Sequence, residues 1–416
     1  MEMTKYKLGE LAEVTRGASL SGQFYAEKGK LIRLTLGNFN MNGGGFKENT
    51  SKTDLYFTGT VRDEFILNEG DIITPLTEQS LGLLGTTARI PESGKYIQSQ
   101  DVALVRCKKG LLDPNFCYYL ISSSIVRQQL SAAAQQTKIR HTSPEKIKDC
   151  TVWIPDFDVQ KNIGRILTDI DNKIVINRRI NDNLEAMAKQ LYDYWFVQFD
   201  FPNEEGKPYK SSGGAMVWNE KLKREIPQGW NAANIFDELS VQYGFPFSID
   251  LFTEKPTNIP VVRIRDILEN SVSAYSREEA DEKYKLQKQD LLIGMDGNFH
   301  MNYWNDNVSY LNQRSVRLRA KPNSTVSILQ ARYDIAPYIK AKELRAKGST
   351  VGHLSDKDLK ELFVLVSPNA DFRNKFDSIL AEIIENRCEI ESLTKQRDEL
   401  LPLLMNGQAS VNYHLS

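Results

Sequence analysis

The segment from residue 163 to residue 195 reads IGRILTDIDNKIVINRRINDNLEAMAKQLYDYW, and the segment from 372 to 404 reads FRNKFDSILAEIIENRCEIESLTKQRDELLPLL. In both segments the seam positions recur at alternating steps of four and three residues, and Phe372 follows Ile163 by 209 positions. This spacing gives a helix one apolar seam, which is unstable in water until it packs against another. The two segments therefore predict two long helices that pair as an antiparallel coiled coil.

Each predicted helix follows a folded segment, which we call a globe, and the two globes share landmarks. Residues 141–148 and 353–360 both begin with histidine and lead into a short predicted helix just before a long one. Strand-like runs and short helices alternate in both globes, which predicts an α/β fold of the α+β kind with pseudo-twofold repetition. We interpret the chain as four segments: a first globe at 1–155, a central helix at 156–200, a second globe at 201–368 and a C-terminal helix and tail at 369–416.

Asparagines interrupt both seams near their midpoints. Asn177 and Asn181 lie in the first seam and Asn386 lies in the second. A polar residue in a seam lowers stability but fixes the register, so we expect these amides to meet; alternatively they are tolerated at a partly wet crossing. Each helix of about 35 residues would span roughly 50 Å at ~1.5 Å per residue. Paired helices of that length would hold the globes at a fixed separation.

Composition limits the classes of protein to which the chain can belong. Its 416 residues, 41% hydrophobic and 26% charged, are ordinary for a soluble protein of two or three domains. The first residues lack a signal pattern and no apolar run is long enough to span a bilayer, so we expect a cytoplasmic protein. The four cysteines and four histidines are scattered, which predicts neither a metal site nor a disulfide framework. The net charge of −1 divides into +4 on the two globes and −5 on the helices, and so mild a basic excess is only weak evidence for binding to nucleic acid.

Three stretches resemble the specificity subunits of Type I restriction-modification systems. Residues 211–230 resemble the start of the second target-recognition domain, 177–200 the central conserved region and 400–407 the distal one. The resemblance implies a non-catalytic subunit that reads double-stranded DNA. It also implies two methyltransferase (modification) subunits and ATP-dependent restriction subunits as partners. One departure concerns the helix starts, where the family commonly has Pro followed by Glu-Gln: Gln160 is kept here, whereas Arg373 stands in the second copy.

Motifs for nucleotide or cofactor chemistry are absent from the sequence. It contains no G-x-x-x-x-G-K-[ST] and no G-x-G-x-x-G before a helix, so we expect no cofactor and no catalysis by this chain. The expected function is therefore to read a split, asymmetric DNA target with one globe per half-site, while the paired helices set the spacer. The alternative is a coiled-coil adaptor that joins two proteins without DNA. The target bases and the spacer length cannot be deduced from the sequence.

Two polar loops in each globe are the candidates for contact with bases and phosphates. Arg, Lys, Asn, Gln, Ser and Thr are the side chains that read base edges in the major groove. In the first globe the candidates are Thr77, Gln79, Ser80, Lys138, Arg140 and His141. In the second globe they are Asp296, Asn298, His300, Arg314, Ser349, Thr350 and His353. Arg314 is the first of three alternating arginines, with Arg317 and Arg319. For all of them, a solvated surface without a ligand is the alternative.

The end of the central helix carries more aromatic residues than one seam needs. Tyr192, Trp195 and Phe196 are candidates for a partner-binding surface that docks a methyltransferase subunit, since large aromatic side chains anchor interfaces. Packing against a globe explains them equally well. The sequence leaves both readings open.

Overall fold

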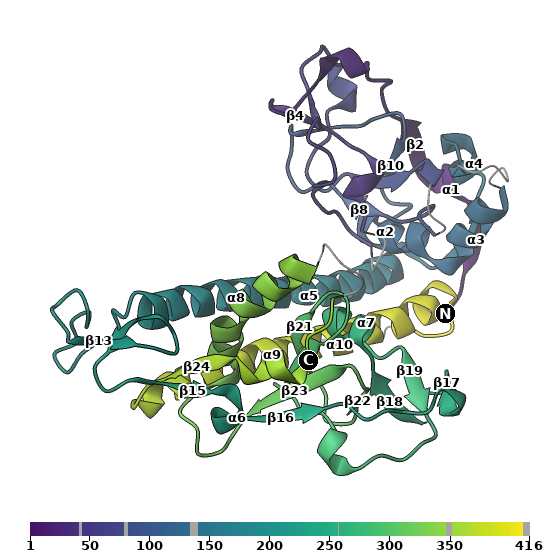
Figure 1. Ribbon diagram of the computed structural model, residues 1–416. Helices are drawn as coiled ribbons and strands as arrows, with labels where there is room; N and C mark the ends of the chain where they lie inside the picture. The colour runs from purple at the N-terminus through teal and green to yellow at the C-terminus, as the bar shows by residue number, and fades with distance from the viewer. Residues whose placement is uncertain (41–43, 79–81, 134–139, 257, 347–351, 411–416) are drawn as a thin grey trace. The chain divides into compact units, whose positions relative to one another are not determined.

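The computed structural model describes residues 1–40, 44–78, 82–133, 140–256, 258–346 and 352–410. The chain divides into two compact units, with residues 1–175 and 391–416 in unit 1 and residues 176–390 in unit 2. Two long helices, α5 (Phe157–Tyr192) and α10 (Ala370–Met405), each contribute one half to each unit (Figure 1). Each unit therefore combines one globe with a pair of half-helices.

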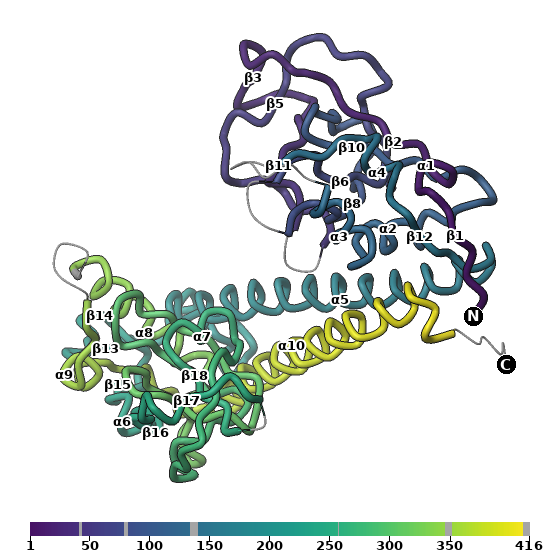
Figure 2. The backbone as a smooth tube through the Cα atoms, turned by 90° about the vertical axis from the view of Figure 1, so that its right-hand side faces the viewer, coloured from purple at the N-terminus to yellow at the C-terminus, as the bar shows by residue number. Residues whose placement is uncertain are grey.

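Unit 1 is built around a four-stranded antiparallel sheet (Figure 2). Its strand order is β2 (Ala12–Arg16), β10 (Val102–Cys107), β6 (Ile72–Pro75) and β8 (Ala88–Arg89). A second sheet has the order β3 (Tyr25–Ala26), β5 (Tyr56–Phe57), β4 (Leu31–Arg33) and β9 (Tyr96–Ile97). Unit 1 also contains two separate strand pairs: β1 (Thr4–Lys7) with β12 (Thr151–Ile154), and β7 (Thr77–Glu78) with β11 (Arg140–His141). The helices are α1 (Leu8–Leu11), α2 (Pro114–Ser122), α3 (Ser124–Ala133) and α4 (Pro144–Lys148), with 3₁₀ turns at Gly22–Phe24 (η1), Leu36–Asn38 (η2) and Asp63–Phe65 (η3).

Unit 2 repeats this topology. Its first sheet has the order β16 (Leu239–Tyr243), β23 (Ser315–Ala320), β20 (Leu291–Gly294) and β21 (Met301–Tyr303). Its second has the order β17 (Phe252–Thr253), β19 (Ala274–Ser276), β18 (Ile259–Val262) and β22 (Tyr310–Leu311), and β15 (Asn231–Asn234) pairs with β24 (Phe363–Val366). The helices are α6 (Ile235–Glu238), α7 (Ile264–Glu269), α8 (Ile328–Ala346) and α9 (Asp356–Lys360). A hairpin of β13 (Met216–Asn219) and β14 (Arg224–Pro227) precedes them.

The same strand order in both units confirms the predicted duplication and the α+β character of the globes. Serines cap the short helices before both long helices. Ser143 Oγ accepts a hydrogen bond from the Lys146 amide before α4, and Ser355 Oγ accepts one from the Asp358 amide before α9. No described helix is long and apolar enough to cross a membrane.

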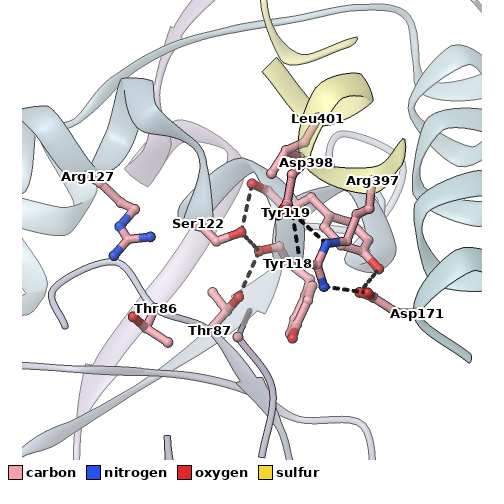
Figure 3. A pocket seen from close by; sticks show the side chains of 11 residues that line it. Thr86, Thr87, Tyr118, Tyr119, Ser122, Arg127, Asp171, Arg397, Asp398 and Leu401 are labelled. Atoms are coloured by element: carbon pink, nitrogen blue, oxygen red, sulfur yellow. Dashed lines mark hydrogen bonds and ion pairs between the residues drawn. The ribbon is translucent and has the colours of Figure 1, made fainter. Parts of the chain in front are cut away.

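The long helices pair antiparallel, as their seams predict. In unit 2, Asn386 Nδ2 donates to Asn181 Oδ1 at 3.1 Å, so the expected meeting of amides is confirmed for this pair. For Asn177 the expectation is wrong, because its amide donates to Glu389 Oε2 at 2.7 Å. In unit 1, Arg397 donates to Asp171 at 2.9 Å, and Tyr119 of α2 donates to the same carboxylate at 2.6 Å (Figure 3).

The structural repeat differs from the sequence repeat by one helical turn. Helix α10 begins and ends 213 positions after α5 (370 against 157, 405 against 192), whereas the apolar series are offset by 209. A shift of four residues keeps a residue on the same helix face, so both offsets describe the same seam.

The offset of 213 makes Arg373 the counterpart of Gln160, so the second helix start has an arginine where the family commonly has glutamine. Gln160 bonds the carbonyls of Leu111 and Pro155 and the Asp113 amide. Arg373, 213 positions later, donates to carbonyls of the corresponding loop, at Lys321, Pro322 and Ser324. Arg373 thus donates to loop carbonyls in unit 2 as Gln160 does in unit 1, but only Gln160 also accepts a hydrogen bond from a loop amide.

Candidate nucleic-acid interface

The two candidate loops of unit 1 meet in space. Strand β7 pairs with β11, which places Thr77 opposite His141 and Glu78 opposite Arg140. His141 is exposed and Thr77 is half-buried. Gln79, Ser80 and Lys138 lie outside the described residues. Two segments separated by more than sixty residues thus form one small surface.

A buried carboxylate supports this strand pair from beneath. Glu78 is 4% exposed, and its Oε1 accepts hydrogen bonds from the Gly82 and Leu83 amides at 2.5 and 2.7 Å. Arg140 lies 3.8 Å from the other oxygen of Glu78, and its Nη1 donates to Ser131 Oγ at 3.0 Å. Arg140 therefore has protein partners, which hold its guanidinium in place.

A cleft lies beside the β7–β11 pair. Its volume is about 530 Å³, and its lining includes Thr77 and His141 together with residues of β4, η2 and the segment 47–52. These last residues were not among those predicted from the sequence, because they follow no periodic pattern and belong to no recognised motif.

The candidate loops of unit 2 meet at the corresponding place. Asp296 and His353 form an isolated antiparallel bridge, and the Gly297 amide donates to the Gly352 carbonyl at 2.9 Å. Asp296 Oδ1 lies 2.6 Å from His353 Nδ1, and its Oδ2 accepts from Arg314 Nη1 at 2.6 Å. Burial acts to raise the pKa of Asp296, but the hydrogen bonds from Arg314 and His353 hold this pKa below its ordinary value. The carboxylate is therefore ionised near neutrality and orients two potential donors to DNA.

Two further candidates of unit 2 follow Asp296 within four residues, and only the sequence places them beside the triad of Asp296, Arg314 and His353. Asn298 is exposed and His300 is half-buried. The side chain of Arg314 is 67% exposed, so its pairing with Asp296 leaves part of the guanidinium accessible. Ser349 and Thr350 lie outside the described residues.

The three arginines do not alternate along one strand face, because Arg314 precedes β23 whereas Arg317 and Arg319 lie within it. Arg317 is 6% exposed and donates to Ser240 Oγ at 3.1 Å, because β23 lies between two other strands. Arg319 makes two hydrogen bonds with the Asp290 carboxylate at 2.6 and 2.7 Å. Of the three, only Arg314 presents most of its side chain to solvent.

The structure also corrects the partner-binding candidates. Tyr192, Trp195 and Phe196 are 7%, 4% and 0% exposed, and they belong to the core of unit 2. Trp195 packs against Phe372 with 4.7 Å between ring centroids, and Tyr192 donates to Asp334 at 2.8 Å. These aromatic residues join the helices to a globe, so they do not provide an accessible docking surface.

The described residues include no group of three or more His, Cys, Asp or Glu side chains placed to hold a metal ion. The cysteines are free thiols in unlike settings, two buried and two half-buried. The described polar groups of both sites instead suit hydrogen bonding and ion pairing with a polar ligand.

Comparison with known proteins identifies the family. Residues 1–186 and 242–399 match the family described as Type I restriction modification DNA specificity domain. The MjaIX specificity subunit of Methanocaldococcus jannaschii is 25% identical over 317 residues, which cover 73% of this chain and 71% of that relative. The EcoBI specificity subunit of Escherichia coli is 26% identical over 172 residues, 40% of this chain and 36% of that relative.

A solved structure shares the fold. The S subunit of a Type I restriction-modification system from M. genitalium aligns with a TM-score of 0.60 at 17% identity, over 97% of this chain and 96% of that one. The family description does not favour an adaptor without DNA. The chain belongs to the family of Type I restriction-modification specificity subunits, whose role is recognition of DNA sequence.

Proposed function

We propose that each unit reads one half of a split, asymmetric duplex target and that the paired long helices set the spacer between the halves. One observation carries this proposal. The same scaffold brings the same two loops together in both units, but with Thr77 and His141 in unit 1 and with Asp296, Arg314 and His353 in unit 2. Equal scaffolds with different side chains suit two half-sites of unlike sequence.

The side chains of unit 2 suggest which base edges they contact. The guanidinium of Arg314 can pair with the O6 and N7 atoms of guanine, and the amide of Asn298 can pair with adenine. Asp296 holds Arg314 at 2.6 Å and so reduces the side-chain entropy that binding would remove. In unit 1, Thr77 and His141 offer a hydroxyl and an imidazole for the same purpose.

The helices would set the spacer because their register is fixed. Asn181 bonds both Asn386 and the Ile383 carbonyl, so a slip of one turn would bury the amide without these partners. Seven residues added to each helix lengthen it by about 10 Å, which is about three base pairs. Insertion after Val175 and after Ile390, the limits of the compact units, should lengthen the spacer and leave both half-sites unchanged. Altered half-sites would contradict this division of roles.

We propose that an outward face of α5 and of the π-helical turn that follows it (η4, Asp193–Val197) provides the partner surface that the buried aromatic residues cannot. Ile176, Ile180, Met187, Tyr194 and Val197 lie at steps of four, seven, seven and three, and all are 37% exposed or more. Such spacing forms a second apolar seam. We assign this seam to the helices of modification subunits, with the restriction subunits joining the same complex.

Selection from a random-sequence DNA library tests the main proposal. The chain in complex with the modification subunit should enrich two fixed half-sites at a constant spacing. Arg314→Ala should then relax the half-site read by unit 2 and leave the other half intact. Enrichment of no motif would overturn the proposal, and so would loss of both half-sites with Arg314→Ala in a folded protein.

Co-purification tests the partner surface separately. Met187→Glu with Tyr194→Glu should abolish capture of the modification subunit, because charged side chains would enter an apolar interface. Leu268→Glu is the control, since Leu268 is 54% exposed in unit 2 and belongs to α7, not to the seam. Equal capture by all variants would contradict the assignment.

A further inference from the structure

We propose that the cleft in unit 1 is a DNA-binding groove, in which Lys47 and Lys52 contact backbone phosphates and Gln100 reads a base of the first half-site. The inference rests on the proposed function and names the contacts of that same site. It adds three residues that belong to neither of the candidate loops.

The position of the cleft links it to the candidate loops. Its lining includes the β7–β11 pair with Thr77 and His141, the η2 region with the segment 47–52, and the stretch 99–101, besides β4 and the segment 18–25. A volume of about 530 Å³ is enough for several polar groups of a ligand but small for a folded partner. DNA lying on the loops would therefore also contact the cleft.

The segment that carries the two lysines is held in place by hydrogen bonds. Asn49 Nδ2 donates to Thr35 Oγ1 at 2.8 Å, and Asn49 Oδ1 accepts from the Ser51 amide at 2.9 Å. The Lys47 amide donates to the Asn38 carbonyl at 3.0 Å. Both lysines therefore project from a defined backbone, which reduces the entropy lost when they bind a ligand.

The charges of the cleft favour an anionic ligand. Lys47 and Lys52 are exposed, and neither forms an ion pair with the described residues. Arg33 differs, because Asp54 neutralises it at 3.1 Å and its guanidinium lies 3.8 Å from the centroid of the Tyr25 ring. The two lysines outnumber the one carboxylate of the lining, Asp101, which forms no salt bridge with the described residues, and so they suit the closely spaced phosphates of a DNA strand.

Gln100 is the candidate for base recognition. It is exposed, and its amide makes no hydrogen bond with the described part of the chain. The nearby Gln98 is 1% exposed, and its amide bonds the Thr15 and Val102 carbonyls. The hydroxyl of Ser99 is buried without a described partner. Gln98 is therefore structural, whereas Gln100 can pair through two hydrogen bonds with the edge of adenine.

Salt dependence of DNA binding tests the lysines. In the complex with the modification subunit, Lys47→Ala and Lys52→Ala should each lower the slope of log affinity against log salt by about 0.9, the value for one lost phosphate contact. Lys109→Ala is the control, since Lys109 is exposed in unit 1 but does not line the cleft. Wild-type slopes in both cleft variants would overturn this part of the inference.

Library selection tests the glutamine. Gln100→Ala should lower the preference at one position of the first half-site by about tenfold and leave the second half-site unchanged. Gln128→Ala, an exposed glutamine of α3 outside the cleft, should keep the wild-type motif. If the wild type enriches a split motif that Gln100→Ala retains in full, this inference fails and the proposed function stands. If the wild type enriches no motif, the proposed function itself fails.

Discussion

Unit 1 and unit 2 fill the same positions of the helix pair with opposite chemistry. In unit 1, Asp171 and Arg397 form an ion pair at 2.9 Å. The offset of 213 between the helices places Ile384 and Leu184 at the corresponding positions of unit 2, and both are buried in its apolar core. The helix pair therefore accepts either an ion pair or an apolar pair at these positions, because the apolar residues on both sides fix its geometry.

Each unit also contains a contact between an arginine and a tyrosine ring, but the two residue types lie on opposite elements in the two units. In unit 1, Arg89 of β8 lies over the ring of Tyr118 of α2 at 5.0 Å; in unit 2, Arg332 of α8 lies over the ring of Tyr303 of β21, also at 5.0 Å.

The positions of these partners correspond between the units. Arg89 is opposite Ile72 in β6, and Tyr303 is opposite Leu291 in the equivalent strand β20. Tyr118 and Arg332 each lie five residues after the side chain that caps their helix, Asp113 or Ser327. The pair is thus kept while its members change places, which indicates that the contact matters more than either residue.

The largest effect is expected where the units are identical. Gly17 and Gly244 follow the equivalent strands β2 and β16, and a Cβ atom would lie 2.2 Å from the Gln98 carbonyl oxygen or 1.9 Å from that of Asn312. Because the obstacle is backbone, Gly17→Ala and Gly244→Ala should each lower the free energy of unfolding by about 3 kcal/mol or more. Urea denaturation measures this loss.

Gly22→Ala is the control for this prediction. Its Cβ atom would lie 3.8 Å from the nearest neighbouring atom, so its stability should stay close to that of the wild type. If Gly17→Ala behaved like Gly22→Ala, the close approach of the two segments would not be a shared requirement of the scaffold.

The ion pair of unit 1 should be replaceable by the apolar pair of unit 2. Arg397→Leu or Asp171→Ile alone should each cost about 2 kcal/mol, because each breaks the partly buried ion pair, although Arg397 would keep Asp398 and Asp171 would keep Tyr119. The double variant, combined with Tyr119→Phe because Tyr119 donates to Asp171, should return to within about 1 kcal/mol of the wild type. Hydrogen exchange of the α2 amides reports the effect locally. A combined variant as unstable as the sum of its parts would contradict the equivalence of the two units.

The exchanged pair predicts a smaller effect. Arg89→Tyr or Tyr118→Arg alone should cost about 1–2 kcal/mol, since each loses the attraction between cation and ring. The double variant restores the pair in the order found in unit 2, so its coupling free energy should favour it by about 1 kcal/mol. A double-mutant cycle of urea denaturation measures this coupling. Additive costs would mean that the contact contributes nothing.

The seam and the duplication were predictable from sequence because they depend on periodicity and repetition. The 4,3 series predicted the helix pair and the meeting of Asn181 with Asn386. Sequence could not show that Asn177 meets Glu389, since a side chain beside the seam is not marked by the pattern. Nor could it show that Trp195 is buried, because an aromatic residue suits a core and an interface equally well.

The candidate sites were predictable only in outline. Loops that differ between the two copies include Thr77, His141, Asp296 and His353, which the structure brings together in pairs. The ion pair between Asp296 and Arg314 joins residues 18 positions apart through a turn in which Arg314 has a φ of 65°. No periodic pattern predicts such a contact, because the backbone conformation decides it.

The smallest expected effect is a difference between the two units in how their stability depends on pH. Asp334 lies seven residues after the Ser327 cap, where unit 1 has the buried Leu120 seven residues after Asp113. Burial raises the pKa of Asp334 to about 6, although Tyr192, Gln330 and the Leu365 amide donate hydrogen bonds to it. Between about pH 4 and 6 the folded chain therefore binds more protons at this site than the unfolded chain, so its contribution to stability falls as pH rises.

Asp334→Asn should remove this contribution because the amide does not titrate. The unfolding temperature of the variant minus that of the wild type should be a few degrees higher at pH 7 than at pH 5, because only the wild type loses stability as the pH rises. Thermal unfolding at both pH values measures it, and Leu120→Asn in unit 1 is the matched comparison, which should destabilise equally at both. A pH-independent difference for Asp334→Asn would show that its carboxyl ionises in the folded chain as it does in the unfolded one, and that the two units differ at this position only in polarity.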